Sequence, residues 1–431
     1  MNQFDHQLAI SVETERSTPI RAVGLRRAVF ILLCLITFFI PWEQMLVIPG
    51  FSSVIFAVSS VALGLAVFSV LFRLRLKRPP LAWFVLALYV YWCFVSMLWT
   101  SDAAATQGQV ISYVSLLLFV WMMWEFVDSR QYFMWVLRSF FLGACLATVL
   151  MFQAYLTTRT VALVEDGRYA VAGMDPNELA AILGAAIIIA TYLATNTSSS
   201  WRVVYWLYIP LACVAVLLTG SRGGALGLMV CLGATLLLSG SRSWKALVLF
   251  ALAAGLAIWL VPQLVPEELL ERVTEGTESH TFQVRYEQWR LGLQMWSEHP
   301  FLGVGAGAFV AAAVESGGLP LVAHNTFVQT LAENGLVGMG LLLLGWALLM
   351  RTVLHLPQRE RLLWLGAGLA WVVAAVALSL EYAKFTWLVY AWIMVQPACL
   401  ELTEEVQVDD KPTLELPSGH MVGTNQRAEV P

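Results

Sequence analysis

The stretch ELAAILGAAIIIATYLAT, residues 178–195, decides the class of fold to which this chain belongs. Its only charged residue is the first one, and an apolar run of about 20 residues can cross the hydrocarbon core of a bilayer as a helix. Similar runs recur along the chain. It is 59% hydrophobic and 13% charged, whereas a soluble protein is about 25% charged. The composition therefore excludes a soluble enzyme, and the net charge of −4 argues against a nucleic-acid partner.

Apolar runs of this kind occur at twelve places, so we predict an all-α polytopic membrane protein with about twelve transmembrane helices. The eighth and the last runs are short, which leaves eleven spans as the alternative count. The predicted spans lie near residues 28–40, 52–72, 81–100, 109–127, 132–156, 178–195, 203–219, 225–240, 246–264, 336–354, 364–380 and 386–400.

The distribution of basic residues indicates how these spans are oriented. Of the 25 Lys and Arg residues, 18 fall at the chain ends and in the loops of one side, although the other side has the longer loops. Basic residues accumulate on the cytoplasmic side, so both termini are predicted to be cytoplasmic. The expected segments are a cytoplasmic N-terminal segment (1–27), transmembrane helices 1–9 (28–264), an outer-face loop (265–335), transmembrane helices 10–12 (336–400) and a disordered cytoplasmic tail (401–431).

The long outer-face loop is the first place to look for function, because long loops on a rigid scaffold often carry it. Its segment 282–296 has helical spacing and a predicted apolar stripe, which suits a helix at the membrane interface or one packed on the core. The residues of this stripe are Tyr286, Trp289, Leu293 and Trp296.

Two arginines of this predicted helix are candidate binding residues. Arg285 and Arg290 are five residues apart, which is about 140° of rotation on an ideal helix, so a straight helix cannot point both at one ligand. Arg285 lies nearer the stripe and is expected to face inward. Arg290 is expected to pair with Glu287, three residues earlier. Both remain candidates from the sequence.

Two further arginines flank predicted spans on the outer face. Arg222 lies in GSRGG, residues 220–224, a very short turn between two apolar runs. A charge at this depth is costly and usually faces a partner or a wet cavity. Arg168 lies shortly before DPNE, residues 175–178, where Asp175 is expected to cap a helix whose first residue is proline. That pattern favours a structural role for the two acids and leaves Arg168 as a candidate.

His324 is the sharpest candidate for catalysis. It precedes a predicted helix that Asn325 would cap and Gly335 would end. The positive end of the helix dipole disfavours imidazolium, so the ring is expected to be neutral and able to act as a base near pH 7. The same helix end could bind an anion. The sequence HPFLGVGAGAF, residues 299–309, reads as a turn in which His299 is structural.

The chemistry that these residues suit is the binding of a phosphate or diphosphate at a membrane edge. Arginine is well matched to phosphate oxygens, and a lipid-linked diphosphate could keep its chain in the bilayer while its head meets the arginines. No outer-face cluster of carboxylates or histidines suggests a metal, and no cofactor is expected. The six cysteines lie in or beside apolar runs without a CxxC pair and are interpreted as core residues.

The order of these motifs resembles one known family. It consists of SRGG after a span, two arginines in a long outer loop, HPFLGVGAGAF, and HNTFVQTLAENGLVG leading into a span, preceded by GRYAVAGMDPNELA. The motifs lie within about residues 165–340. This pattern is similar to the O-antigen ligase and O-antigen polymerase superfamily of bacterial inner-membrane glycosyltransferases.

The resemblance implies a GT-C-like membrane glycosyltransferase with a periplasmic active site. For a ligase, O-antigen polysaccharide moves from undecaprenyl diphosphate to the lipid A–core oligosaccharide in a metal-independent, inverting transfer. By the same resemblance, Arg222 and either Arg285 or Arg290 match the essential arginines, and His324 matches the essential histidine. Arg168 is expected to support diphosphate binding.

Three alternatives stay open at this point. An O-antigen polymerase would use the same donor and joins repeat units to one another. A protein O-glycosyltransferase is related but usually longer, with a larger outer domain. A flippase or transporter of lipid-linked sugar would also carry arginines, but we expect such a protein to have charge deep in its spans, and these spans contain little.

Overall fold

A computed structural model describes residues 20–47, 53–73, 76–157, 168–239 and 280–409 of the chain. The regular elements of these described ranges are all helices, and an isolated bridge pairs Val47 with Ser53. This confirms the all-α class that was predicted from the sequence. The six cysteines, all of which lie in the described ranges, are free thiols, as expected for core residues.

The described helices are labelled in chain order. Their bounds are α2 (Ile20–Phe39), η1 (Ile40–Leu46), α3 (Val54–Arg73), α4 (Leu81–Val95), η2 (Ser96–Leu98), α5 (Ala103–Phe126), α6 (Arg130–Thr157), α7 (Pro176–Thr195), α8 (Trp201–Leu218), α9 (Arg222–Leu238), α12 (His280–Glu298), α13 (Phe309–Glu315), α14 (Thr326–Leu354), α15 (Gln358–Ala377) and α16 (Lys384–Asp409).

Nine candidate membrane spans, long and apolar enough for a bilayer, are found in the described part of the chain. They comprise a segment from α2 into η1, one from α4 into η2, and helices α3, α5, α6, α7, α8, α14 and α15, while α9 is a shorter apolar helix. The protein is therefore a multi-pass membrane protein. The total of twelve spans stays a prediction, because the expected span 246–264 lies outside the described residues.

Several helices extend beyond the predicted spans. Helix α2 begins at Ile20, within the segment 1–27 that was expected to precede the first span. The two largest differences concern α14 and α16. Helix α14 begins at Thr326, ten residues before the predicted span, because it continues through a break at Gly335 that has φ 61° and ψ −166°. Helix α16 continues to Asp409, so residues 401–409, which were expected to belong to the tail, are helical.

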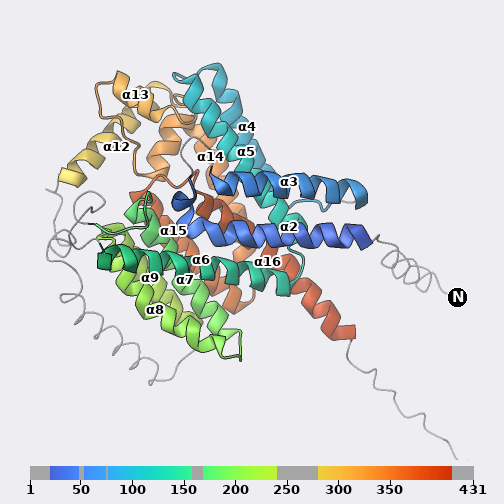
Figure 1. Ribbon diagram of the computed structural model, residues 1–431. Coiled ribbons are helices and arrows are strands. Elements are labelled where there is room, and N and C mark those ends of the chain that lie inside the picture. The colour runs from blue at the N-terminus through green and yellow to red at the C-terminus, as the bar shows by residue number, and fades with distance from the viewer. Residues whose placement is uncertain (1–19, 48–52, 74–75, 158–167, 240–279, 410–431) are drawn as a thin grey trace, which may run out of the picture.

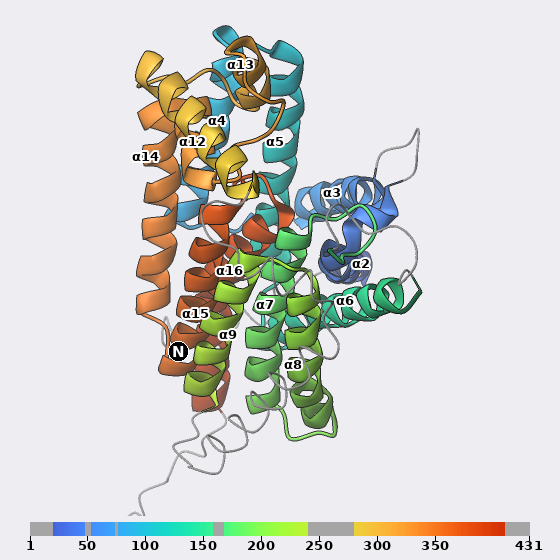
Figure 2. The ribbon, with the colours of Figure 1, turned by 90° about the vertical axis from the view of Figure 1, so that its left-hand side faces the viewer.

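The helices pack around α7, the most buried of the candidate spans. It contacts α6, α8, α9 and α15, while α2 packs on α3 and α6, and α4 packs on α5 and α14. The short helix α13 and the amphipathic helix α12 lie together at one end of the molecule, away from the start of α2 and the end of α16 (Figure 1). Figure 2 shows that they cover the ends of α4, α5 and α14.

Small residues allow α7, α9 and α15 to approach closely. A Cβ atom at Gly224 of α9 would come within 2.5 Å of Ala180 on α7, and one at Gly223 within 3.2 Å of Ala377 on α15. Small residues are typical of helix interfaces in membranes, where van der Waals packing replaces the hydrophobic effect as the main attraction. This seam fixes the start of α9, and therefore the position of Arg222.

Side-chain caps are found at one end of the bundle. Helices α5, α7, α9 and α14 begin with Asp102, Asp175, Ser221 and Asn325, whose side chains accept hydrogen bonds from first-turn N–H groups. Helices α4, α8 and α15, which run the opposite way in the predicted topology, have no side-chain cap. The predicted caps Asp175 and Asn325 are confirmed, as is Pro176 at the first position of α7.

We expect Gly224→Val to destabilise the protein, because the added methyl groups would overlap Ala180. Overpacking of a well-packed interface costs roughly 1–3 kcal/mol. A matched control is Gly227→Ala on the same helix, where a Cβ atom would meet nothing within 4 Å. Thermal unfolding in detergent should show a lower midpoint for Gly224→Val only; equal midpoints would contradict the tight seam.

Candidate functional site at the capped end of the bundle

His324 lies in a polar cavity at the capped end of the bundle. It precedes Asn325, the N-cap of α14, and its side chain is half-buried. The cavity measures about 230 Å³, and its wall includes residues from η1, α7, the loop after α15, and α16. Its lining residues are Glu43, Gln44, Asp175, Glu178, Val322, His324, Leu378, Ser379, Leu380, Tyr382, Ala383 and Lys384.

The start of α14 is tied to the end of α15. The Thr326 hydroxyl donates a hydrogen bond to the Leu378 carbonyl at 2.8 Å and accepts one from the Leu380 N–H at 2.8 Å. Both bonds are buried, so water does not compete for these groups. They hold the loop after α15 against His324 and shape one wall of the cavity.

The sequence did not decide whether Arg285 or Arg290 of α12 belongs to the site. The structure places the two side chains in different surroundings. Arg285 is half-buried and lies close enough to His324 to influence its ionisation. Arg290 is exposed and forms an ion pair with Glu287 at 2.9 Å, as predicted. An exposed pair of this kind contributes little to stability. As the predicted rotation between them implies, Arg285 lies on the inner face of α12 and Arg290 lies on its exposed face.

The prediction of which residues form the buried apolar face of α12 is wrong in part. Tyr286 and Leu293 are exposed, whereas the buried face consists of Gln288, Leu291 and Met295. The latter two belong to a small core with residues of α13 and α14. Trp289 is half-buried, and its indole N–H donates a hydrogen bond to the Ala323 carbonyl at 2.9 Å. Helix α12 is therefore packed on the protein, which was one of the two predicted placements.

Arg168 bridges the start of α7 and the turn before α9. Its Nε donates to the Thr219 carbonyl at 2.9 Å, and its Nη2 donates to Asn177 Oδ1 at 2.7 Å. The next residue, Tyr169, donates its N–H to the Leu218 carbonyl at 3.2 Å. Arg168 thus fixes the position of the GSRGG turn relative to α7.

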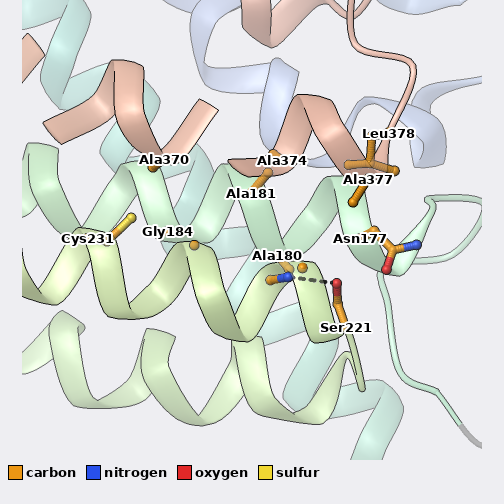
Figure 3. Close-up of a pocket in the computed structure, with 13 residues that line it drawn as sticks. Asn177, Ala180, Ala181, Gly184, Ser221, Cys231, Ala370, Ala374, Ala377 and Leu378 are labelled. Atoms are coloured by element: carbon orange, nitrogen blue, oxygen red, sulfur yellow. Dashed lines mark hydrogen bonds between the residues drawn. The ribbon is translucent and has the colours of Figure 1, made fainter. Parts of the chain in front are cut away.

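Arg222 is the first residue of α9 and is half-buried. The preceding Ser221 caps the helix by accepting a hydrogen bond from the Gly224 N–H at 2.9 Å. Figure 3 shows Asn177, Ser221 and Leu378 near one end of the seam between α7, α9 and α15. The cavity in this seam is only about 20 Å³, which is room for about one water molecule. It is a packing seam, whereas the cavity beside His324 can hold a ligand.

Shared neighbours show that the candidate residues gather at one end. Leu378 lines both the seam and the polar cavity, and Asn177 lines the seam while it binds Arg168. The structure therefore brings the start of α9, Arg168 and His324 to the same end of the bundle, with Arg285 facing it from α12. Arg290 points away from this group.

Sequence reasoning missed one ion pair in the cavity. Lys384, the first residue of α16, forms a 2.8 Å ion pair with the largely buried Glu43 of η1. The two residues are too far apart in the sequence for any spacing rule to connect them. The only hint in the sequence was that each of the two charged residues lies next to an apolar run, on the side predicted to be the outer face.

The polar cavity adjoins an apolar one. The second cavity measures about 400 Å³ and lies between α2, α3 and α5, with Ile40, Phe56 and Phe119 among its lining residues. Tyr382 and Lys384 line both cavities. A ligand with a polar head and an apolar chain would therefore find both environments side by side.

The ring of His324 is held in its neutral form. Burial lowers its pKa from the ordinary value of 6.5, the positive charge of Arg285 lowers it further, and Asp175 opposes this shift. The predicted direction is confirmed, although burial rather than the helix dipole is the first cause. A neutral imidazole at pH 7 can accept a proton from an approaching hydroxyl group.

The glycine-rich segment HPFLGVGAGAF forms a structural turn that docks on the break in α14. Val304 and Gly305 donate their N–H groups to the Ala332 and Glu333 carbonyls, both at 2.9 Å. Leu336 donates its N–H to the Pro300 carbonyl at 2.9 Å. The interpretation of this segment as a turn is confirmed. The part of the chain that the structure describes contains no group of three or more residues suited to hold a metal ion.

Taken together, the fold and the site define a multi-pass helical membrane protein in which a histidine and several arginines gather at one end. Residues 207–343 match the family model of the O-antigen ligases, and the match spans Arg222, both arginines of α12 and His324. The match covers about a third of the chain and confirms the predicted resemblance to the O-antigen ligase superfamily, whose members are glycosyltransferase-like enzymes. No curated protein matches the chain.

The influence of Arg285 on His324 can be tested without an activity assay. Diethyl pyrocarbonate modifies neutral imidazole, so the pH dependence of modification of the peptide that contains His324 reports its pKa. We expect half-maximal reactivity below pH 6.5 in the native protein, with a shift to higher pH in Arg285→Gln because one cause of the lowered pKa is removed. Mass spectrometry provides the measurement, and the matched control is Arg290→Gln. A shift in the control, or none in Arg285→Gln, would contradict this geometry.

Proposed function

We propose that this protein is an O-antigen ligase, which transfers O-antigen polysaccharide from undecaprenyl diphosphate to the lipid A–core oligosaccharide at the periplasmic face of the bacterial inner membrane. One observation carries the proposal: His324 and Arg285 share an end of the bundle with the start of α9, which bears Arg222, and the family match covers all three residues.

The proposed reaction is a metal-independent, inverting transfer. His324 accepts the proton of the acceptor hydroxyl, and the hydroxyl oxygen forms a bond to the anomeric carbon of the donor. The bond between that carbon and the diphosphate oxygen breaks, so the diphosphate leaves with the bonding electron pair. The proton on His324 then passes to solvent. The lowered pKa of His324 supports the first step, since the ring is neutral at pH 7.

The departing diphosphate needs positive charge in place before it leaves. Arg222 and Arg285 are assigned to bind it, because preorganised cations stabilise a leaving group without reorganisation of the site. Arg168 contributes indirectly, because its hydrogen bonds hold the start of α7 next to the turn before α9. Of the two arginines in α12, we assign this role to Arg285, since Arg290 lies on the exposed face with Glu287.

The two adjoining cavities support a lipid-linked substrate. The polar cavity contains His324 and Lys384, and the apolar cavity beside it lies between the candidate spans α2, α3 and α5. A saccharide head could enter the first while an isoprenoid or acyl chain occupies the second. In this arrangement both termini are cytoplasmic, which agrees with the position of α12 and α13 away from the start of α2 and the end of α16 (Figure 1).

An O-antigen polymerase is the alternative that the family match favours equally, because it would use the same donor. A flippase has less support. Four acids are buried within candidate spans of the described residues, and each has a partner at hydrogen-bond distance. Glu43 pairs with Lys384, and Glu125 accepts a hydrogen bond from the Lys77 N–H. Glu333 accepts one from the Gly307 N–H, and Glu360 accepts one from the Tyr192 hydroxyl.

The lipopolysaccharide of a strain that lacks this gene separates the two enzymes. We expect core oligosaccharide without O-antigen on a gel, together with long polymer on the polyprenyl carrier in the lipid extract. A core capped by a single repeat unit would instead indicate a polymerase. Normal lipopolysaccharide would overturn both assignments.

Site variants test the roles within the ligase proposal. Arg222→Ala should lower the transfer rate by roughly 10²–10³-fold, as found when one preorganised charge donor is removed. His324→Ala should lower it by roughly 10²–10⁴-fold, the usual contribution of a general base. Arg290→Ala is the matched control and should leave the rate nearly unchanged. The rates are measured with purified protein, lipid-linked donor and lipid A–core acceptor; full activity in Arg222→Ala would remove it from the diphosphate site.

A further inference from the structure

The main chain at His324 has an unusual conformation. Its φ angle is 49°, and among the described residues it is the only residue other than glycine with a positive φ. This left-handed conformation is unfavourable for a residue with a side chain, and it persists where the surroundings hold it in place. The residues that provide these restraints can be identified from the hydrogen bonds around His324.

Both backbone polar groups of the preceding residue are held by side chains. Ala323 is fully buried; its N–H donates to Gln329 Oε1 at 2.8 Å, and its carbonyl accepts from Trp289 Nε1 at 2.9 Å. Because the residue is buried, water cannot replace either bond. Gln329 therefore holds Ala323 from α14, while Trp289 holds it from α12.

The residue after His324 is fixed as well. Asn325 accepts hydrogen bonds from the N–H groups of Phe327 and Val328 at 3.0 and 3.1 Å, which is the N-cap of α14. His324 thus connects two immobilised residues, so its left-handed torsions are what direct the imidazole into the polar cavity.

Gln329 is itself oriented by a buried neighbour. Its Nε2 donates to Glu333 Oε1 at 2.5 Å, and Glu333 Oε2 accepts from the Gly307 N–H at 2.8 Å. The carboxyl group accepts the amide hydrogens, so the amide oxygen of Gln329 must face the Ala323 N–H. The Ser379 hydroxyl, on the cavity wall, also donates to this oxygen at 3.2 Å.

The bond from Trp289 links His324 to Arg285. The two α12 residues are four positions apart and lie on the same face of the helix. When Trp289 holds the Ala323 carbonyl, it also sets how far Arg285 lies from the imidazole. One hydrogen bond thus connects the proposed base with a proposed diphosphate ligand.

We propose that Gln329 and Trp289 are positioning residues of the transfer reaction, which hold Ala323 from two sides and thereby fix His324 in its left-handed conformation. They act through His324 and have no contact with substrate. This inference rests on the proposed role of His324 as the general base.

The test uses Trp289→Phe and Gln329→Met in the full-length protein, with the lipid-linked donor and lipid A–core acceptor. One matched control is Trp296→Phe on the same helix, because the indole N–H of Trp296 has no hydrogen-bond partner among the described residues. The other is Gln294→Met, which changes an exposed amide. We expect kcat to fall by about 10–100-fold, as for residues that orient a catalytic group, while the KM for the donor stays within about twofold. The controls should behave as the native protein.

Two further readouts separate positioning from a general loss of stability. In the His324→Ala background, Trp289→Phe should add no further loss, because residues that act through one group are not additive. The acid limb of kcat/KM should also move to higher pH in Trp289→Phe, as the imidazole leaves its buried place beside Arg285. The other charged groups around the cavity, Asp175, Glu178, Glu43 and Lys384, are unchanged in this variant.

Each outcome decides the proposal. Native kcat in Trp289→Phe, or a loss that adds fully to that of His324→Ala, would overturn the positioning role while the base assignment stands. Full activity in His324→Ala would overturn the base assignment itself, and the positioning role with it. If Gln329→Met does not fold, Trp289→Phe and its control decide alone.

Discussion

The break in α14 at Gly335 is the feature on which the arrangement of the site depends. A helix that departs from regular geometry leaves carbonyl and N–H groups without their intrahelical partners, and a protein surrounded by lipid must satisfy them internally. Here the segment 299–309 does so, with hydrogen bonds to Ala332, Glu333 and Leu336 on both sides of the break. The approach is so close that Cβ atoms at Gly303 or Gly335 would overlap the backbone opposite. The glycine-rich motif therefore serves to dock this segment on the helix, and the residues that we propose as catalytic lie outside it.

This docking affects the whole capped end of the bundle. It places Gly307 so that its N–H binds Glu333, which orients Gln329, which in turn holds the residue before His324. It also holds α12 and α13 over α14, because the buried face of α12 packs in the same small core as Phe309. The motif HPFLGVGAGAF and the motif HNTFVQTLAENG are thus two halves of one structural unit.

Local rules predicted much of this, because the relevant interactions lie within a few residues. Asp175 and Asn325 cap their helices, Arg290 pairs with Glu287, and eleven of the twelve predicted spans correspond to described helices. The failures involve partners distant in sequence. The pair of Lys384 with Glu43 joins residues more than 300 positions apart. Tyr286 and Leu293 were expected on the buried face of α12, but Gln288 is buried in their place, since helix packing rather than hydrophobicity alone selects that face.

The cavity beside His324 carries charges of both signs: Glu43, Asp175 and Glu178 line it together with Lys384, and Arg285 acts on His324 from α12. Asp175 accepts hydrogen bonds from the first turn of α7, and Glu43 is paired with Lys384, so the negative charge of both acids is already offset. Glu178 lies in the first turn of α7, where the helix dipole favours an acid. The starts of α7, α9 and α14 gather at this end, each contributing partial positive charge, and Arg222 and Arg285 add to it. Burial, and after it the positive charge of Arg285, lower the pKa of His324 and favour its neutral form, while Asp175 opposes this shift. Under the proposed function, Arg285 would serve two purposes, because its charge lowers the pKa of His324 and would also stabilise a departing diphosphate.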